Sequence, residues 1–273
     1  MGWAKYNEDN VSIFNNNNPD CLQRNKRQER PLVETKPETK RQADRPLPEQ
    51  VKKDVAAVNE FLIAEARPLP VIILADVSGS MGQNDKIKVL NDAVREMISV
   101  FSEEENGIAE IHVCVIAFGG SEAKVHETLK PARKIVWKPM QANGKTPMGS
   151  AFTMAKHLVE DRNIIPGRAY RPTIVLVSDG AANDSWEEPL KELLSSERAS
   201  KASRFAIGIG DDAEKTTLNA FLADSAGRVI EAHEARDIKK FFRWVTMSVT
   251  SRSRSSTPNR LEESIIDFDE IPF

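Results

Sequence analysis

The chain has 273 residues, of which 40% are hydrophobic and 29% are charged, and its formal net charge is −3. This length fits one globular domain of roughly 150–200 residues with additional segments. The nearly balanced charge provides no basic field that would attract nucleic acid to the whole chain.

The cysteine content and the apolar runs indicate a cytoplasmic protein. The two cysteines, Cys21 and Cys114, do not form a disulfide framework. The first residues, "MGWAKYNEDN", lack the apolar segment of a signal peptide. No apolar run approaches the length of about 18 residues that a membrane span needs. We therefore expect a location in the reducing cytoplasm and no membrane contact.

Residues 1–67 are polar and rich in proline, and we expect most of this extension to be disordered. The exception is 51–66, "VKKDVAAVNEFLIAEA", where apolar residues at helical spacing predict a helix. The basic stretch 24–45 contains interleaved acids and no aromatic residues. That pattern favours a solvated linker over a nucleic-acid surface.

Apolar runs alternate with amphipathic segments from residue 68 to residue 250. This alternation predicts an α/β domain in which helices cover both faces of a mostly parallel sheet. Ligands of such sheets bind outside the carboxyl ends of the strands. The expected strands are 69–76, 109–119, 172–180, 203–210 and 228–232, with short strands or a hairpin at 124–129 and 133–137; the expected helices are 85–104, 147–162, 185–199, 217–225 and 235–251.

The loop "ADVSGSMG" (75–82) follows the first expected strand and allows several interpretations. A phosphoryl transferase of the haloacid-dehalogenase type would use Asp76 as nucleophile, but Ser78 stands where its second acid is needed. A phosphate-binding loop at "GKT" (144–146) fails because Pro139 occupies the position of the required first glycine.

The third interpretation is a metal site. Asp76, Ser78 and Ser80 alternate along the loop, so their oxygens can turn toward one point. Thr146, at the entry to a helix, and Asp179, at the end of a strand, would add oxygens at the same edge of the sheet. Hydroxyl and carboxylate oxygens are hard ligands that suit Mg²⁺ or Mn²⁺.

These five residues, in their order and strand context, resemble the metal-ion-dependent adhesion site of von Willebrand factor A (VWA) domains. More narrowly, "PVIILADVSGSMG", "GKTPMGSAF", "YRPTIVLVSDG" and "FAIGIGDDA" are similar to the bacterial tellurite-resistance TerY type. The resemblance covers about 68–250. It implies a Rossmann-like fold, a divalent metal and a function in binding, and it implies stress-response modules that include protein kinases and phosphatases.

With two acids and three neutral hydroxyls, the ion would keep uncompensated charge and an open position. We therefore predict a non-enzymatic module that binds an Asp or Glu of a protein partner. The alternative is a metal-dependent phosphatase or nuclease, which would need a second metal or a general base that the sequence does not show. The pattern leaves open the partner, the pathway, the oligomeric state and which ligands act through water.

Residues 251–273 are expected to be a flexible linker followed by an acidic peptide. The ending "IDFDEIPF" resembles the C-terminal tip of bacterial single-stranded-DNA-binding proteins, with one acid fewer and Glu270 in place of an Asp. The resemblance implies recruitment of DNA replication or repair enzymes. The expected partner-binding residues are Asp267, Phe268, Asp269, Glu270, Ile271, Pro272 and Phe273.

Overall fold

The computed structural model describes residues 66–104, 108–210, 213–223, 229–260 and 268–271. The predicted helix at 51–66 therefore lies almost entirely outside the described residues, as does the rest of the extension up to residue 65. Among the described residues, no helix combines the length and the apolar character needed to cross a membrane.

The described residues form one six-stranded sheet with the order β3-β2-β1-β4-β5-β6. All neighbouring strands are parallel except β2 and β3, which are antiparallel. Strand β1 is buried from its second residue onward because it lies inside the sheet and is covered on both faces. The strands are β1 (Arg67–Asp76), β2 (Ala109–Gly119), β3 (Glu122–Pro131), β4 (Thr173–Ser178), β5 (Ser203–Ile209) and β6 (Val229–Ala232).

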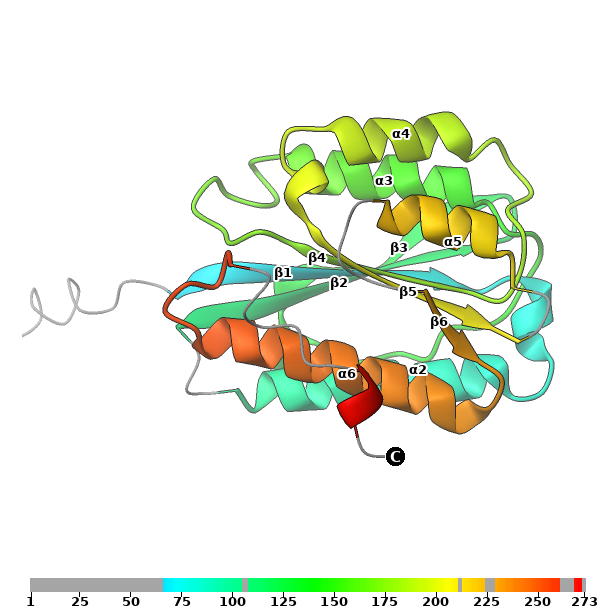
Figure 1. Cartoon of the computed structure of the whole chain (residues 1–273), viewed down its shortest axis with the longest axis horizontal. Coiled ribbons are helices and arrows are strands. Elements are labelled where there is room, and N and C mark those ends of the chain that lie inside the picture. The colour runs from blue at the N-terminus through cyan, green and yellow to red at the C-terminus, as the bar shows by residue number, and fades with distance from the viewer. Residues whose placement is uncertain (1–65, 105–107, 211–212, 224–228, 261–267, 272–273) are drawn as a thin grey trace, which may run out of the picture. The chain divides into compact units, whose positions relative to one another are not determined.

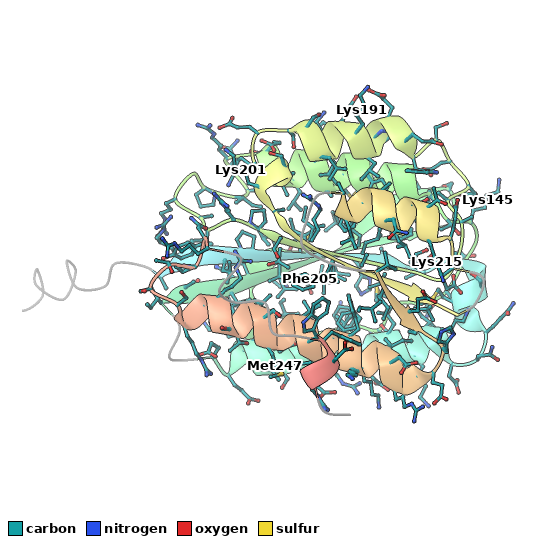
Figure 2. All side chains as sticks on the ribbon, in the orientation of Figure 1. Lys145, Lys191, Lys201, Phe205, Lys215 and Met247 are labelled. Atoms are coloured by element: carbon teal, nitrogen blue, oxygen red, sulfur yellow. The ribbon has the colours of Figure 1, made fainter. Side chains whose placement is uncertain are left out.

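Helices cover both faces of the sheet (Figure 1). Helices α2 (Lys86–Ser102) and α6 (Ala235–Arg254) pack on one face, and α3 (Met148–Glu160), α4 (Glu187–Ser195) and α5 (Lys215–Leu222) pack on the other. Each helix has an apolar stripe, as Leu90, Val94 and Met97 illustrate on α2. Because neighbouring residues of a strand point to opposite faces, the sheet separates two hydrophobic cores. Figure 2 shows Phe205, a strand β5 residue of the α2/α6 core, between the sheet and α6.

The structure confirms the predicted mixed α/β architecture but differs at 122–137. Residues Glu122–Pro131 form one strand along β2, and Ala132–Lys134 form a short 3-10 helix, η2, in place of a second strand. Pro131 ends the strand because its ring nitrogen has no proton to donate to the ladder. The expected strand at 133–137 is therefore wrong.

The last helix is longer than predicted, and it corrects the expected start of the linker. Helix α6 runs to Arg254, and Arg252 within it is only 3% exposed. The Arg252 guanidinium donates to the carbonyls of Pro258 and Arg171 at 3.1 and 2.8 Å and to the Thr173 hydroxyl at 2.7 Å. Burial lowers the pKa of Arg252 to about 10. These bonds hold the segment after residue 250 against the domain.

Candidate metal centre

The predicted ligands lie at the point where the strand order reverses. The chain builds the sheet outward from β1 through β2 to β3, and then restarts beside β1 with β4. Crossovers on opposite faces leave a crevice at the carboxyl ends of the two central strands. Asp76 is the last residue of β1, and Asp179 directly follows β4. The topology therefore brings these two acids to one edge although they are distant in sequence.

Asp76 is fully buried and fixes the start of its loop. Its Oδ1 accepts the backbone N–H of Ser78 at 2.8 Å, and its Oδ2 accepts the hydroxyl of Ser178 at 2.6 Å. Burial raises the pKa of the Asp76 carboxyl, although the hydrogen bonds from Ser178 and Ser78 act in the opposite direction. A buried carboxylate is costly unless it is paired or bound to a cation.

Two serine hydroxyls connect this loop to Asp179. The Ser80 hydroxyl donates to Asp179 Oδ1 at 2.7 Å, and its oxygen lies 3.0 Å from the Ser78 hydroxyl oxygen. Ser80 belongs to the short 3-10 helix η1 (Gly79–Gly82), which begins directly after Ser78. Oxygens from two loops thus come within hydrogen-bond distance at one place.

The loop of Thr146 is tied to both of the others by backbone hydrogen bonds. Gly79 N–H donates to the Gly144 carbonyl at 2.9 Å, and Asn183 N–H donates to the Thr146 carbonyl at 3.1 Å. Gly144 has a φ of +69°, and a Cβ there would lie 2.5 Å from the Cα of Gly120. Only glycine fits this close crossing of two backbones. Thr146 is 9% exposed, and the two backbone hydrogen bonds bring its loop to the loops that follow Asp76 and Asp179.

Two side chains beside the predicted ligands were not predicted from the sequence. Lys86, the first residue of α2, places its Nζ 2.8 Å from Asp179 Oδ2. Its side chain is 19% exposed and that of Asp179 is 0% exposed, so the pair is largely shielded from water. Ser178 holds Asp76 as described above. The position of Ser178 directly before Asp179 could have indicated that it belongs to the site. Nothing in the sequence distinguishes Lys86 from other lysines on helix surfaces.

The residues present fit a hard divalent cation. All five side chains offer oxygen ligands, which Mg²⁺ and Mn²⁺ prefer. Within the described part of the chain, no group of three or more His, Cys, Asp or Glu residues is arranged to hold a metal. A metal at this edge would therefore depend on the hydroxyls of Ser78, Ser80 and Thr146. The ammonium of Lys86 beside Asp179 shows that this edge already attracts positive charge.

A hollow of about 360 Å³ lies beside this edge. Its lining includes Lys145 and Pro147, which flank Thr146, together with Asn183 and Asp184. Asp184 also caps α3, because its two carboxylate oxygens accept the N–H groups of Gly149 and Ser150, both at 2.9 Å. The Lys145 side chain is exposed and lies at the end of the molecule where the parallel strands terminate (Figure 2).

The predicted partner-binding tail is described only in part. Asp267, Pro272 and Phe273 lie outside the described residues. Phe268–Glu270 form a short 3-10 helix, η4, and Ile271 is 3% exposed. The sequence predicts a free peptide, whereas Phe268 lies against Trp244 of α6 at a ring-centroid distance of 5.4 Å.

Comparisons with known proteins identify the fold. Residues 71–181 match the family model of the von Willebrand factor type A domain. No curated protein matches the chain. One similar solved structure is a von Willebrand factor type A protein from Catenulispora acidiphila, with 19% identity, a TM-score of 0.54, and coverage of 68% of this chain and 43% of that one.

Two further solved structures share the fold. The pilus adhesin SpaC from Lactobacillus rhamnosus GG is 13% identical, with a TM-score of 0.56 and coverage of 69% of this chain and 31% of that one. Proximal thread matrix protein 1 from the mussel byssus, with a zinc-occupied MIDAS motif, is 18% identical, with a TM-score of 0.51 and coverage of 66% and 48%. The chain spans less than half the length of each of these three proteins, so the likeness concerns the domain alone.

Proposed function

Because this chain has the von Willebrand factor A fold, we propose that it is a non-enzymatic interaction protein. Its metal centre binds a divalent cation, Mg²⁺ or Mn²⁺, and through it an acidic residue of a protein partner. One observation supports this more than any other. The Ser78, Ser80 and Asp179 oxygens from two distant loops lie in one hydrogen-bonded chain. The ligands proposed are Asp76, Ser78, Ser80, Thr146 and Asp179.

The ligand set explains why the partner contributes a carboxylate. Five side-chain oxygens leave one position of an octahedral ion open. Because Lys86 already compensates one of the two carboxylates, that of Asp179, the site with a divalent ion keeps a positive charge that an Asp or Glu from outside can neutralise. The exposed ammonium of Lys145 beside Thr146 adds attraction for an acidic segment. Exposed charges of this kind increase the rate of encounter more than they increase affinity.

The experiment is a pull-down of partners from a lysate in Mg²⁺ and in EDTA. We expect the wild-type chain to retain a partner in Mg²⁺ only, and we expect the double variant Asp76→Ala with Ser78→Ala to lose it. Asp161→Ala is the matched control, because Asp161 lies beyond the other end of α3 from Thr146. Equal retention by the double variant in Mg²⁺ would reject the proposal.

The second candidate function is a metal-dependent phosphatase or nuclease. It would use the same oxygens but would need a second metal or a general base beside them. Phosphatase and nuclease assays with Mg²⁺ separate the two functions, because Asp179→Ala would abolish a true activity. Turnover that depends on Mg²⁺ and on Asp179 would favour the enzyme.

For the C-terminal tail we propose the recruitment of a DNA replication or repair enzyme, in a bacterial stress-response or defence complex of the TerY type. The sequence resemblance of the ending "DFDEIPF" supports this proposal. An acidic peptide with aromatic and aliphatic anchors suits an apolar pocket with a basic rim. Fluorescence anisotropy with candidate enzymes tests it: deletion of Phe273 should abolish binding, and undiminished binding would refute it.

A further inference from the structure

The described part of the tail contacts a defined surface of the domain. Phe268 stands edge-on to Trp244, with a ring-centroid distance of 5.4 Å and an interplanar angle of 79°. The Lys240 ammonium lies 4.9 Å from the centre of the Phe268 ring. Trp244 in turn contacts Phe205 of β5 at 4.8 Å, so the tail aromatic joins the aromatic cluster beneath α6. Figure 1 shows η4, in red, beside the middle of α6.

Ile271 completes the contact. It is 3% exposed and belongs to the hydrophobic core that α2 and α6 form with the sheet. The turn of η4 lets both anchors point to the domain, because the Ile271 N–H donates to the Phe268 carbonyl at 3.2 Å. Asp269 between them is exposed. Ile271 is thus buried against the domain and Phe268 is partly buried, whereas Asp269 is exposed to solvent.

The chemistry of this surface matches an acidic, aromatic peptide. Three groups of the domain favour such a sequence. Trp244 packs edge-on to the aromatic ring, Lys240 places a cation near the ring, and an apolar site accepts Ile271. The positive charge of Lys240 also complements the acids of "DFDEIPF". These are the features expected of a partner pocket that would receive the same peptide.

We propose that the α6 surface at Lys240 and Trp244, together with the adjoining apolar site of Ile271, is a binding site for the chain's own C-terminal peptide. The peptide occupies this site in cis until a partner displaces it. The idea rests on the proposed function only in its last step, because the partner must compete for Phe268 and Ile271. Only residues 261–267 separate η4 from the described segment that ends at Arg260. A short linker gives an effective concentration on the order of millimolar, so modest intrinsic affinity keeps the site covered.

The test uses the whole chain and a fluorescein-labelled peptide with the sequence of residues 261–273. An open variant, Phe268→Ser with Ile271→Ser, loses both anchors while the rest of the chain is retained. We expect the peptide to bind the open variant at least tenfold more tightly than it binds the wild type, whose site is covered. Equal affinity for both proteins, or no binding to the open variant, would overturn the proposal.

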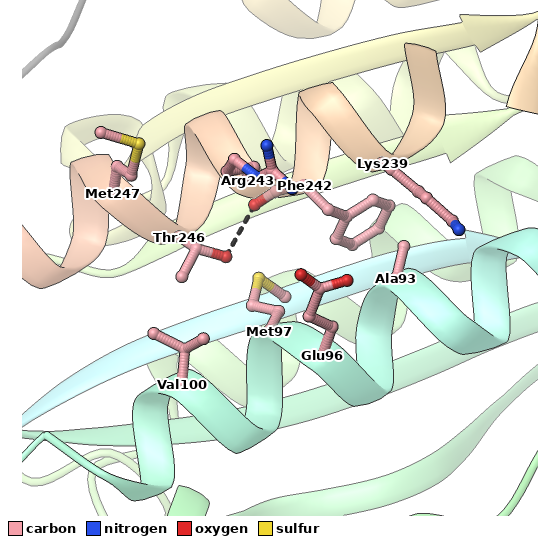
Figure 3. A pocket seen from close by; sticks show the side chains of 9 residues that line it. All are labelled: Ala93, Glu96, Met97, Val100, Lys239, Phe242, Arg243, Thr246 and Met247. Carbon is pink, nitrogen blue, oxygen red and sulfur yellow. Dashed lines mark hydrogen bonds between the residues drawn. The ribbon is translucent and has the colours of Figure 1, made fainter. Parts of the chain in front are cut away.

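Neighbouring lysines on α6 supply a matched control. Lys240→Gln in the open variant should weaken peptide binding several-fold, because the cation over the Phe268 ring is lost. Lys239→Gln should change it little, because Lys239 lines a different feature, the groove of about 280 Å³ between α2 and α6 (Figure 3). A larger effect at Lys239 than at Lys240 would place the peptide in that groove and reject the assigned surface.

This experiment contains neither metal nor partner, so its failure is distinct from a failure of the proposed function. If the peptide binds the open variant but no enzyme binds the tail, the docking site stands and the recruitment proposal is wrong. If an enzyme binds wild type and open variant equally, the docked anchors are not what that enzyme recognises. Circular dichroism of each variant shows that the domain remains folded.

Discussion

Replacing the Asp76 carboxylate by an amide should leave the metal-free domain nearly as stable as the wild type and remove its stabilisation by Mg²⁺. In Asp76→Asn, the amide oxygen can still accept the Ser78 N–H, as Oδ1 does at 2.8 Å. The amide nitrogen then faces the Ser178 oxygen, and the Ser178 hydroxyl can donate to the Gly180 carbonyl, which lies 3.2 Å away. The number of hydrogen bonds is kept, and a buried negative charge is removed.

The magnitudes follow from these contacts. Weakening one hydrogen bond costs about 1 kcal/mol, and removing the buried charge offsets part of that cost. In EDTA we therefore expect the two proteins to differ by no more than about 1 kcal/mol in the free energy of unfolding. A ligand present at 100 times its Kd stabilises the folded state by about 2.7 kcal/mol. At a Mg²⁺ concentration of about 100 times the Kd, the free energy of unfolding of the wild type should therefore rise by about 2.7 kcal/mol, and that of the variant should rise much less.

The assay is urea unfolding followed by circular dichroism, in EDTA and across a Mg²⁺ series. Asp161→Asn, at the far end of α3 from the proposed metal ligands, should respond to Mg²⁺ as the wild type does. Equal Mg²⁺ stabilisation of the wild type and Asp76→Asn would show that the ion does not bind at Asp76. Absence of any Mg²⁺ effect on the wild type, repeated with Mn²⁺, would refute the assigned metal centre.

Three further substitutions test other contacts. Lys86→Met removes the cation beside Asp179, so Mg²⁺ affinity by calorimetry should rise about tenfold, while Lys88→Met, on the exposed face of α2, should leave it unchanged. Arg252→Met removes three hydrogen bonds of a buried guanidinium. At about 1.5–3 kcal/mol for each bond, less about 3 kcal/mol for relieved desolvation, urea unfolding should show a loss of about 1.5–6 kcal/mol, and a change near zero would contradict this account. Gly149→Ala places a Cβ 2.4 Å from a backbone carbonyl oxygen of the loop before α4 and should cost about 1–3 kcal/mol, whereas Gly167→Ala, with nothing within 4 Å, should be nearly neutral.

The order of strands and helices was predictable because it depends on local sequence patterns. The alternation of apolar runs with amphipathic segments indicated the strands and helices between residues 68 and 250, since each period reports which face of an element is buried. The second strand expected at 133–137 failed because apolar residues there suggested pairing, while Pro131 ended the ladder. The end of α6 was misplaced because its last turn is polar, and only tertiary contacts bury Arg252 within it.

The candidate site also contains residues that the sequence predicts and residues that it does not. Asp76, Ser78, Ser80, Thr146 and Asp179 could be named because they follow strands or precede a helix, and parallel strands end at one edge. Lys86 could not be named, because its pairing with Asp179 depends on how α2 lies against the strand ends. Ser178 stands directly before Asp179 in the sequence, but its hydrogen bond to Asp76 depends on the register of β4 beside β1.

The sequence by itself determined the α/β class, the oxygen-rich character of the loop after β1, and the acidic aromatic character of the C-terminal end. Only the tertiary structure decided that Lys86 compensates Asp179 and that Phe268 and Ile271 rest on α6. The physical reason is the range of the interactions. Hydrophobic periodicity and the type of metal-binding side chain depend on residues that are close in sequence. Ion pairing and the docking of the tail depend on surfaces that distant segments form together.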